Sequence, residues 1–446
     1  MMNNHLPILS LSVVVITCLS VIYTLYPHDS DKKKYNFALW GGASLAILSL
    51  IVINKFEFDS HEKKASVNYW SSASSFLLTD DKLFLNFKND FPALIGNIVY
   101  MIGHGIQQYE LAHIQDLIEK NDLSKEAPLE IIGKDRDKIK NVVLVMGESS
   151  LSSYYTIYGY EKFNTTPRLQ LLKDEGKICA LKKAHSPAPT TRTSVPLNLT
   201  FTSPERFSEV FVKKSIVNLA NENGYKTFWL ATQNSGGISG YGSTYEFIAR
   251  SASVWVSPDM KHPTYGVVPE DDDVMLTLIH NEFQDTAEYK FFILHLVGNH
   301  SPYNIRYKEQ DKLALPDASD YARSIHKVDR ILGGIIEAAD KYLGEYALLY
   351  VSDHGEIVGK DHGLTLGGYD QYNIPFILKP VDKSDCDYVE NKYRLKNGYI
   401  SGLTTKYILS EYLGYSINSH VIDATRDLVL HADGIVYDYE KLPQSK

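Results

Sequence analysis

The chain has few cysteines, no basic block and no internal repeat, and the first two absences each exclude a class of protein. Three cysteines in 446 residues are too few for a fold held together by disulfides. The formal net charge is −9 and no Lys/Arg cluster of the nucleic-acid-binding type is present, so we expect no nucleic-acid partner. The composition is that of a globular protein, with 44% hydrophobic and 22% charged residues. The length suggests roughly two or three domains.

The three cysteines differ in their surroundings. Cys18 lies in an apolar segment, which leaves Cys179 and Cys386. These two could pair if their domain faces an oxidising compartment, and otherwise they are two ordinary buried thiols.

Two uncharged apolar runs near the start of the chain indicate a membrane anchor. Residues 6–26 and 37–54 are each about long enough to span a bilayer as a helix. The first run has no basic segment before it and no clear cleavage site, so a retained hairpin is favoured over a signal peptide. The connecting loop holds Lys32, Lys33 and Lys34. The positive-inside rule therefore places that loop in the cytoplasm and the rest of the chain outside.

The sequence predicts three parts: a transmembrane hairpin of two helices at 1–60, an interfacial bridge and linker at 61–138, and a globular domain at 139–446. Residues 91–111 are apolar at near-helical spacing but contain three glycines and a histidine, which favours an amphipathic helix at the membrane surface. The polar stretch 120–140 has the composition of a linker.

From residue 141 onward, apolar strands alternate with helical segments, which predicts an α/β layered domain. Strands are expected at 141–147, 226–231, 290–298, 347–351 and 376–380, and helices at 215–223 and 322–343.

Four of these strands run into polar clusters. The clusters are Glu148, Gln233 with Asn234, His300, and Asp353 with His354. Each has a plain structural explanation when taken alone: a helix cap for Glu148, a loop for the amides, a polar turn for the Asp-His pair. His295, inside its strand, is expected to be a core histidine. If the strands are parallel neighbours, however, the clusters meet at one edge of the sheet. Glu, Asp and His ligands suit zinc or manganese.

A threonine-rich stretch before an apolar run adds a candidate nucleophile. Residues 190–194 read T-T-R-T-S and have the character of a helix start, where a hydroxyl lies among free backbone N–H groups. A threonine that also contacts a metal ion can lose its proton near neutral pH and attack phosphorus. The alternative is a threonine-rich cap with a structural role only.

The motifs together resemble the phosphoethanolamine transferases of the bacterial inner membrane, within the alkaline phosphatase and sulfatase superfamily. They are G-E-S at 147–149, Y-G-Y at 158–160, T-T-P at 165–167, T-x-x-S-V-P at 191–196, H-x-x-G-N-H-S-P at 295–302 and S-D-H-G-E at 352–356. The resemblance is close over residues 139–380 and loose in the membrane part. It implies a three-layer α/β domain with a mostly parallel central sheet behind the transmembrane hairpin.

The resemblance also implies an activity and a set of site residues. The expected metal ligands for Zn²⁺, with Mn²⁺ as an alternative, are Glu148, Thr191, Asp353 and His354. Thr191 is expected to take phosphoethanolamine from phosphatidylethanolamine and pass it to lipopolysaccharide, either lipid A or a core sugar, or to a related glycan. Gln233, Asn234 and His300 are expected to contact the phosphate group, and His300 and His362 to transfer protons. The catalytic domain is expected in the periplasm, anchored to the inner membrane.

Two departures from the family pattern affect this interpretation. The family usually has five membrane spans, and two are predicted here. The family often shows L-H-G about a dozen residues after S-D-H-G, where this chain has Leu366, Gly367 and Gly368. His362 is the candidate for the missing imidazole, and a plain loop histidine is the alternative.

Three other activities are weighed against transfer of phosphoethanolamine. A phosphoglycerol transferase is the hardest to separate, because it differs in the donor head group alone. A sulfatase or phosphodiesterase of the same superfamily is less favoured, because sulfatases need a Cys or Ser in a C/S-x-P-x-R context and Thr191 does not supply it. The third is a membrane-anchored binding protein without catalysis, which the retained ligand set disfavours.

Overall fold

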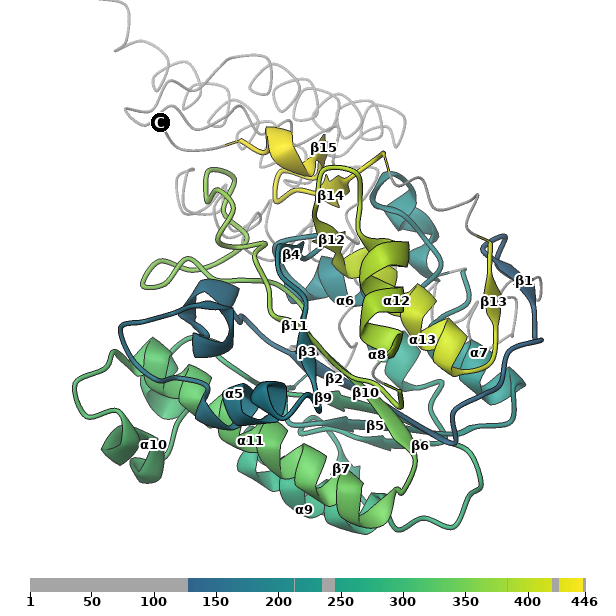
Figure 1. Cartoon of the computed structure of the whole chain (residues 1–446), viewed down its shortest axis with the longest axis horizontal. Coiled ribbons are helices and arrows are strands. Elements are labelled where there is room, and N and C mark those ends of the chain that lie inside the picture. The colour runs from purple at the N-terminus through teal and green to yellow at the C-terminus, as the bar shows by residue number, and fades with distance from the viewer. Residues whose placement is uncertain (1–126, 212, 235–244, 383, 419–424, 444–446) are drawn as a thin grey trace, which may run out of the picture. The chain divides into compact units, whose positions relative to one another are not determined.

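The computed structural model describes residues 127–211, 213–234, 245–382, 384–418 and 425–443. These residues all fall within one compact unit of the chain (Figure 1). The predicted transmembrane hairpin, the predicted helix at 91–111 and Cys18 lie outside them. No helix among the described residues combines the length and the apolar character that crossing a bilayer requires.

A seven-stranded mixed sheet forms the centre of the domain. Its spatial order is β3 (Cys179–Ala180), β11 (Phe376–Lys379), β10 (Tyr346–Ser352), β2 (Asn141–Gly147), β9 (Lys290–His295), β5 (Lys226–Ala231) and β6 (Val254–Val256). The five strands from β10 to β6 are parallel, whereas β11 runs antiparallel to β10 and to β3. The expectation of a mostly parallel sheet therefore holds for this block of five, and the sheet as a whole is mixed.

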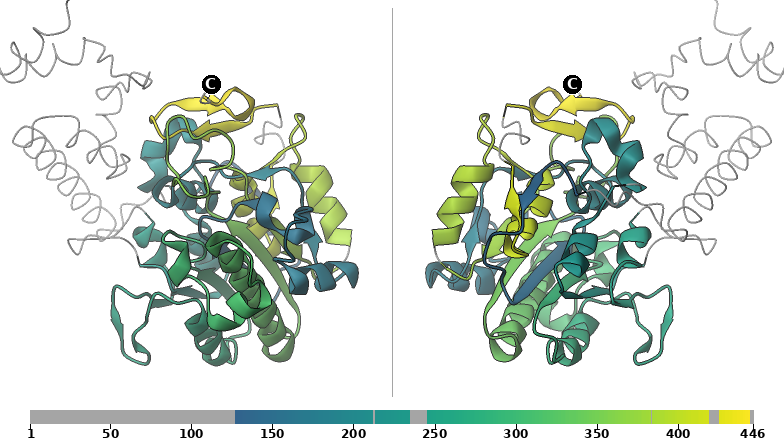
Figure 2. Two further views of the ribbon diagram at one scale, coloured as in Figure 1. Left: turned by 90° about the vertical axis from the view of Figure 1, so that its left-hand side faces the viewer. Right: turned by 90° about the vertical axis from the view of Figure 1, so that its right-hand side faces the viewer.

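Helices cover both faces of the sheet, so the domain has three layers (Figures 1 and 2). One apolar core lies between the sheet and α5 (Pro167–Asp174), α9 (Asp273–Glu282) and α11 (Asp320–Tyr342). The other lies between the sheet and α6 (Thr191–Leu199), α7 (Ile216–Glu222), α8 (Glu246–Ala249), α12 (Ser384–Tyr393) and α13 (Thr405–Tyr412). Successive residues of β2 alternate between the two cores, as the pleat of a strand buried on both faces requires.

Smaller elements complete the domain. The two-stranded sheets are β1 (Ile131–Gly133) with β13 (Ser416–Ile417), β4 (Ala184–His185) with β12 (Ile400–Ser401), β7 (Lys261–His262) with β8 (Gly266–Val267), and β14 (Leu428–Leu430) with β15 (Val436–Asp438). Helix α10 spans Glu309–Ala314, and short 3-10 helices span Ser152–Tyr154, Thr156–Tyr158, Pro204–Phe211, Tyr303–Ile305, Gly402–Thr404 and Tyr439–Lys441. The stretch predicted as a linker contains β1. In Figure 2 the β14–β15 hairpin stands at the opposite end of the domain from α9 and α11.

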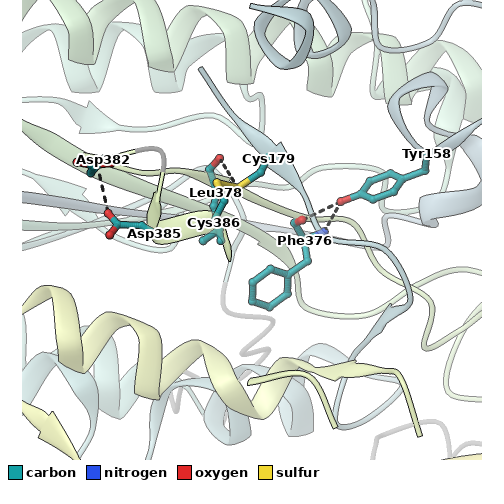
Figure 3. Close-up of a disulfide and its surroundings, with 7 residues drawn as sticks. All are labelled: Tyr158, Cys179, Phe376, Leu378, Asp382, Asp385 and Cys386. Atoms are coloured by element: carbon teal, nitrogen blue, oxygen red, sulfur yellow. Dashed lines mark hydrogen bonds between the residues drawn. A yellow bond between two sulfur atoms is a disulfide. The ribbon is translucent and has the colours of Figure 1, made fainter. Parts of the chain in front are cut away.

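The pairing of Cys179 with Cys386, left open by the sequence, is confirmed. The two residues form a disulfide that joins β3 to α12 across 207 positions of sequence, with their Cα atoms 6.3 Å apart (Figure 3). Nearby, the hydroxyl of Tyr158 donates to the carbonyl of Phe376 at 2.9 Å and accepts from its N–H at 2.8 Å. The antiparallel edge of the sheet is thereby fixed by a covalent bond as well as by hydrogen bonds, and such a bond is typical of an oxidising compartment.

Candidate active site

The four polar clusters predicted from the sequence follow four neighbouring parallel strands. The strands β10, β2, β9 and β5 lie side by side, and each runs in the same direction. The clusters therefore project from a single edge of the sheet, where open α/β sheets hold their ligands. The loop after β9 packs directly against the residue that follows β2. Gly298 has a φ of +51°, and a Cβ added there would lie 2.6 Å from the backbone oxygen of Glu148, so only glycine fits this approach.

Two carboxylates and one imidazole form the centre of the site. Glu148, Asp353 and His354 are fully buried, and one ligand atom from each lies within 4.8 Å of the others. Nε2 of His354 is 3.3 Å from Oε1 of Glu148 and 3.4 Å from Oδ2 of Asp353. Nδ1 of His354 lies 2.7 Å from the carbonyl of Gly355. Because a carbonyl can only accept, Nδ1 donates to it, and Nε2 is the ring atom that faces the carboxylates.

Burial and mutual charge shift the pKa of all three groups. Burial raises the pKa of Asp353 well above its usual range, and the Glu148 carboxylate adds to the effect. Burial acts on Glu148 in the same direction, but the His354 imidazole outweighs it and holds the pKa of Glu148 well below its usual range. For His354, burial opposes the charged form, yet Asp353 and Glu148 raise the pKa to about 10. Without another cation, the cluster thus favours one ionised carboxylate, one imidazolium and one neutral carboxyl group.

The donor atoms of this cluster fit a divalent cation. Oδ1 of Asp353 accepts from the backbone N–H groups of Ser149, at 3.2 Å, and His354, at 2.7 Å. Oδ2 of Asp353 is buried and has no hydrogen-bond partner among the described residues. A buried carboxylate oxygen without a partner is costly unless it binds something. Two carboxylates and an imidazole nitrogen are ligands of the kind that zinc takes.

Thr191 brings a hydroxyl group to the same cluster. It is the first residue of α6, so its side chain lies at the end of the helix where backbone N–H groups are free. Its Oγ1 donates to Oε2 of Glu148 at 2.8 Å and lies 3.3 Å from Nε2 of His354. The side chain is half-buried. The structure therefore places a partly accessible hydroxyl at the cluster of Glu148, Asp353 and His354 and at the positive end of a helix dipole.

A buried lysine holds the other end of α6. The ammonium of Lys406 donates to the carbonyls of Leu197, at 3.0 Å, and Thr202, at 2.7 Å, and the residue is 1% exposed. Burial lowers the pKa of Lys406 to about 7. A lysine in this position stabilises the C-terminal carbonyls of the helix that begins with Thr191.

We expect Lys406 to make the stability of the domain depend on alkaline pH. Between about pH 7 and the pKa of a free lysine near 10.5, the unfolded chain holds a proton that the folded domain has released. The free energy of unfolding should therefore rise with pH over this window. Lys406→Met should flatten that rise, whereas Lys182→Met, at an exposed position, should leave it unchanged. Denaturant unfolding at pH 7, 8.5 and 10 measures this, and equal slopes for wild type and Lys406→Met would contradict it.

The predicted amide pair divides between two contacts. Nε2 of Gln233 donates to Oε2 of Glu148 at 2.7 Å, so this residue lies directly at the cluster. Asn234 is exposed, and its amide donates to Glu270. Gln233 thus contacts the cluster itself, whereas the side-chain amide of Asn234 contacts Glu270.

Both predicted imidazoles, His300 and His362, lie beside the cluster. A ligand atom from each lies within 4.8 Å of the other and of a carboxylate oxygen of Glu148. The ring of His362 is 4.0 Å from that of His354 and 5.9 Å from that of His300, measured between centroids. His362 is buried and His300 is half-buried. His295, the predicted core histidine, is buried edge-on against Trp229 and Tyr245.

The surroundings of Gly367 disfavour a side chain at that position. Gly367 stands where the family often has the histidine of L-H-G. A Cβ added to Gly367 would lie 2.5 Å from Cδ1 of Ile357 and 2.8 Å from the side chain of Gln371. No side chain fits there without displacing its neighbours, whereas His362 already lies against His354.

Two buried residues of the site region make contacts that the sequence analysis did not predict. Glu356 is buried and contacts His362 and Tyr303. Asp272 is buried and accepts from the hydroxyl of Thr232 and from two backbone N–H groups after β9. Glu356 is the last residue of S-D-H-G-E, which was the available signal. Asp272 lies in an acidic run before a helix, and such a run normally indicates only a helix start.

Comparison with known proteins identifies relatives of this chain. Among proteins, the chain is 26% identical over 332 residues to the putative transferase YhbX of Escherichia coli K12, covering 68% of this chain and 56% of that protein. It is 25% identical over 293 residues to the phosphoethanolamine transferase EptC of the same organism, covering 57% of this chain and 49% of that one. The chain thus spans about half the length of these relatives.

Among solved structures, the chain matches the C-terminal periplasmic domain of E. coli EptC in complex with zinc. The TM-score is 0.58 at 21% identity, over 69% of this chain and 94% of that domain. The match supports the predicted fold and, with the named relatives, the predicted resemblance to phosphoethanolamine transferases. The sulfatase family profile matches residues 140–393. Because this match spans more than half of the 446 residues, the chain belongs to the sulfatase family.

Proposed function

We propose that the protein transfers phosphoethanolamine from phosphatidylethanolamine to lipopolysaccharide, at lipid A or a core sugar, or to a related glycan, with Thr191 as the covalent carrier. The observation that carries the proposal is the contact of the Thr191 hydroxyl with Glu148 and His354 at the helix N-terminus. A nucleophile held at a metal-binding cluster and beside free N–H groups suits attack on a phosphodiester. The names of the relatives supply the head group.

Zinc is the cation we propose, held by Glu148, Asp353 and His354 together with the Thr191 oxygen. The matched EptC domain holds zinc, and the ligand types here are those zinc prefers. A bound zinc ion would lower the pKa of the threonine hydroxyl and polarise the phosphoryl oxygens.

The side chains of the protein account for the nucleophilic attack and the proton transfers. Oγ1 of Thr191 attacks phosphorus, the bond from phosphorus to the diacylglycerol oxygen breaks, and His300 gives that oxygen a proton. The proton of Thr191 already points at Glu148, which accepts it. In the second half, an acceptor hydroxyl loses its proton to an imidazole and attacks phosphorus. The bond to Oγ1 then breaks, and Thr191 recovers its proton. The N–H groups of α6 and the Gln233 amide would stabilise the phosphoryl oxygens.

The location we propose is the bacterial inner membrane, with residues 139–446 in the periplasm behind the predicted hairpin and bridge. A lipid donor requires the active site to reach the bilayer surface, and the apolar runs at 6–26 and 37–54 supply the predicted anchor. The disulfide between Cys179 and Cys386 supports an oxidising compartment.

The donor head group is the property that tests this function most simply. The full chain, loaded with zinc, is mixed with vesicles of phosphatidylethanolamine or phosphatidylglycerol and with a lipid A acceptor, and the products are weighed by mass spectrometry. We expect phosphoethanolamine on the acceptor with the first donor alone, and loss of product when zinc is chelated. Phosphoglycerol on the acceptor would indicate the other transferase, and release of free phosphoethanolamine without a modified acceptor would indicate a hydrolase.

A further inference from the structure

A buried carboxylate that the mechanism above does not use lies directly behind His362. Oε2 of Glu356 is 2.9 Å from Nδ1 of His362, and Oε1 accepts a hydrogen bond from the hydroxyl of Tyr303 at 2.5 Å. Glu356 is fully buried and His362 is 7% exposed. Both oxygens of the carboxylate are therefore engaged, one by a phenol and one by the imidazole.

The charge of Glu356 has no conventional partner. Within the described parts of the chain, no Lys or Arg forms an ion pair with it, and His362 is the group beside it that can become positive. A buried carboxylate is strongly destabilising unless it is paired or fully hydrogen-bonded. The hydrogen bonds from Nδ1 of His362 and from the Tyr303 hydroxyl are therefore the contacts that satisfy this buried carboxylate.

The loop that carries His362 is held so that this contact persists. The side chain of Gln371 accepts from the N–H of Leu364 at 2.9 Å and donates to its carbonyl at 2.8 Å. Gln371 is itself fully buried. The backbone two residues after His362 is thereby fixed to the residues that precede β11, which limits how far the imidazole can move.

We propose that Glu356 is a positioning residue that fixes the tautomer and orientation of His362, with Tyr303 holding Glu356 in turn. An ionised carboxylate only accepts hydrogen bonds, so Nδ1 of His362 must carry the proton and Nε2 is left as the basic atom. The ring of His362 lies against that of His354 at the cluster, so this basic nitrogen belongs to the reaction site. The inference rests on the proposed function and assigns the proton-transfer step to a defined pair of residues.

The proton balance of this step is complete with the groups named. When the acceptor hydroxyl attacks the phosphorus bound to Thr191, its proton moves to Nε2 of His362, and the bond between phosphorus and Oγ1 breaks. The imidazolium that forms is stabilised by Glu356, which keeps its charge and does not take the proton itself. Glu148 returns its proton to the threonine oxygen. His362 gives its proton to solvent and His300 takes one from solvent, which restores the starting state.

A double-mutant cycle tests whether Glu356 acts through His362. We expect Glu356→Gln to lower kcat for transfer by about 10- to 100-fold with little change in KM. The substitution impairs proton transfer by His362 and leaves substrate binding unchanged. In a His362→Ala background, Glu356→Gln should lower kcat no further, because the imidazole that Glu356 positions is absent. Tyr303→Phe, which keeps the ring and removes only the hydroxyl, should produce a smaller loss of kcat. A full additional loss from Glu356→Gln in the His362→Ala background would overturn the proposal.

A spectroscopic measurement tests the same proposal without activity. In ¹⁵N-histidine-labelled full-length protein, the His362 signal, assigned by its absence in His362→Ala, should show the proton on Nδ1. Glu356→Gln should alter the position of that signal, and a proton on Nε2 in wild type would overturn the proposal. If the wild type transfers no phosphoethanolamine at all, the proposed function fails while this measurement still reports on the pair. If the wild type transfers phosphoethanolamine but the effects of Glu356→Gln and His362→Ala on kcat are additive, the proposed role of Glu356 is wrong and the proposed function stands.

Discussion

Replacing Thr191 by alanine should abolish transfer, with a loss of about a thousandfold or more in kcat. The hydroxyl of Thr191 is the group placed between Glu148 and His354, and no other residue of α6 is described in contact with either. Removing a covalent nucleophile leaves only the uncatalysed attack of acceptor or water in a pre-formed site. The loss should appear in kcat, and it is measured by the mass-spectrometric transfer assay with saturating phosphatidylethanolamine.

Two further variants separate loss of the nucleophile from disturbance of the helix. Thr191→Ser keeps a hydroxyl and should retain a substantial part of the activity. Thr193→Ala changes a threonine in the first turn of the same helix whose Oγ1 bonds to that of Thr190, and it should retain most of it. Comparable losses in Thr193→Ala and Thr191→Ala would mean that the helix start, and not the hydroxyl, matters.

Asp353→Asn should lose zinc and yet raise the stability of the metal-free protein. Asparagine can keep the two hydrogen bonds that Oδ1 accepts, and its amide would replace the oxygen Oδ2 that has no partner among the described residues. The change also removes the carboxyl group that is buried beside that of Glu148. We expect zinc affinity to fall by at least about 100-fold, because a metal ligand is lost. We expect the free energy of unfolding without metal to rise by about 1–2 kcal/mol.

Asp272→Asn is the matched control, because Asp272 is equally buried but fully bonded. Its oxygens accept from the Thr232 hydroxyl and from the N–H groups of Val297 and Gly298. An amide group there would face N–H donors with an N–H of its own, so we expect the free energy of unfolding to fall by about 2–3 kcal/mol. Thermal or denaturant unfolding in a chelator compares the two variants. Equal destabilisation by both would show that the Asp353 site is not built to bind a cation.

The sheet was the part of the structure most open to prediction. The bounds expected for β2 and β5 agree with the structure, since both are short apolar runs that end in a sharp polar change. The prediction for β9 was three residues too long, because Leu296, Val297 and Gly298 continue the apolar pattern after the strand has ended. The convergence of Glu148, His300 and Asp353 followed from one assumption, that the strands are parallel neighbours, and that assumption is confirmed.

What the sequence could not supply were contacts between loops. Nothing in the spacing of Glu356 and His362 indicates that a turn brings them together, and the glycine at 367 excludes a side chain only because Ile357 and Gln371 lie against it. Likewise, Oδ2 of Asp353 has no hydrogen-bond partner among the described residues because of which groups surround it, and residue type alone does not predict this. Patterns of apolar residues determine elements, whereas the roles of polar residues depend on which loops meet.

The most direct measurement of the central claim is the mass of the peptide that contains Thr191 after the zinc-loaded full-length protein meets phosphatidylethanolamine with no acceptor present. We expect a phosphoethanolamine adduct on Thr191 that disappears when a lipid A acceptor is added. An adduct on another residue, or transfer that proceeds at the full rate with no adduct on Thr191 at any time, would contradict it.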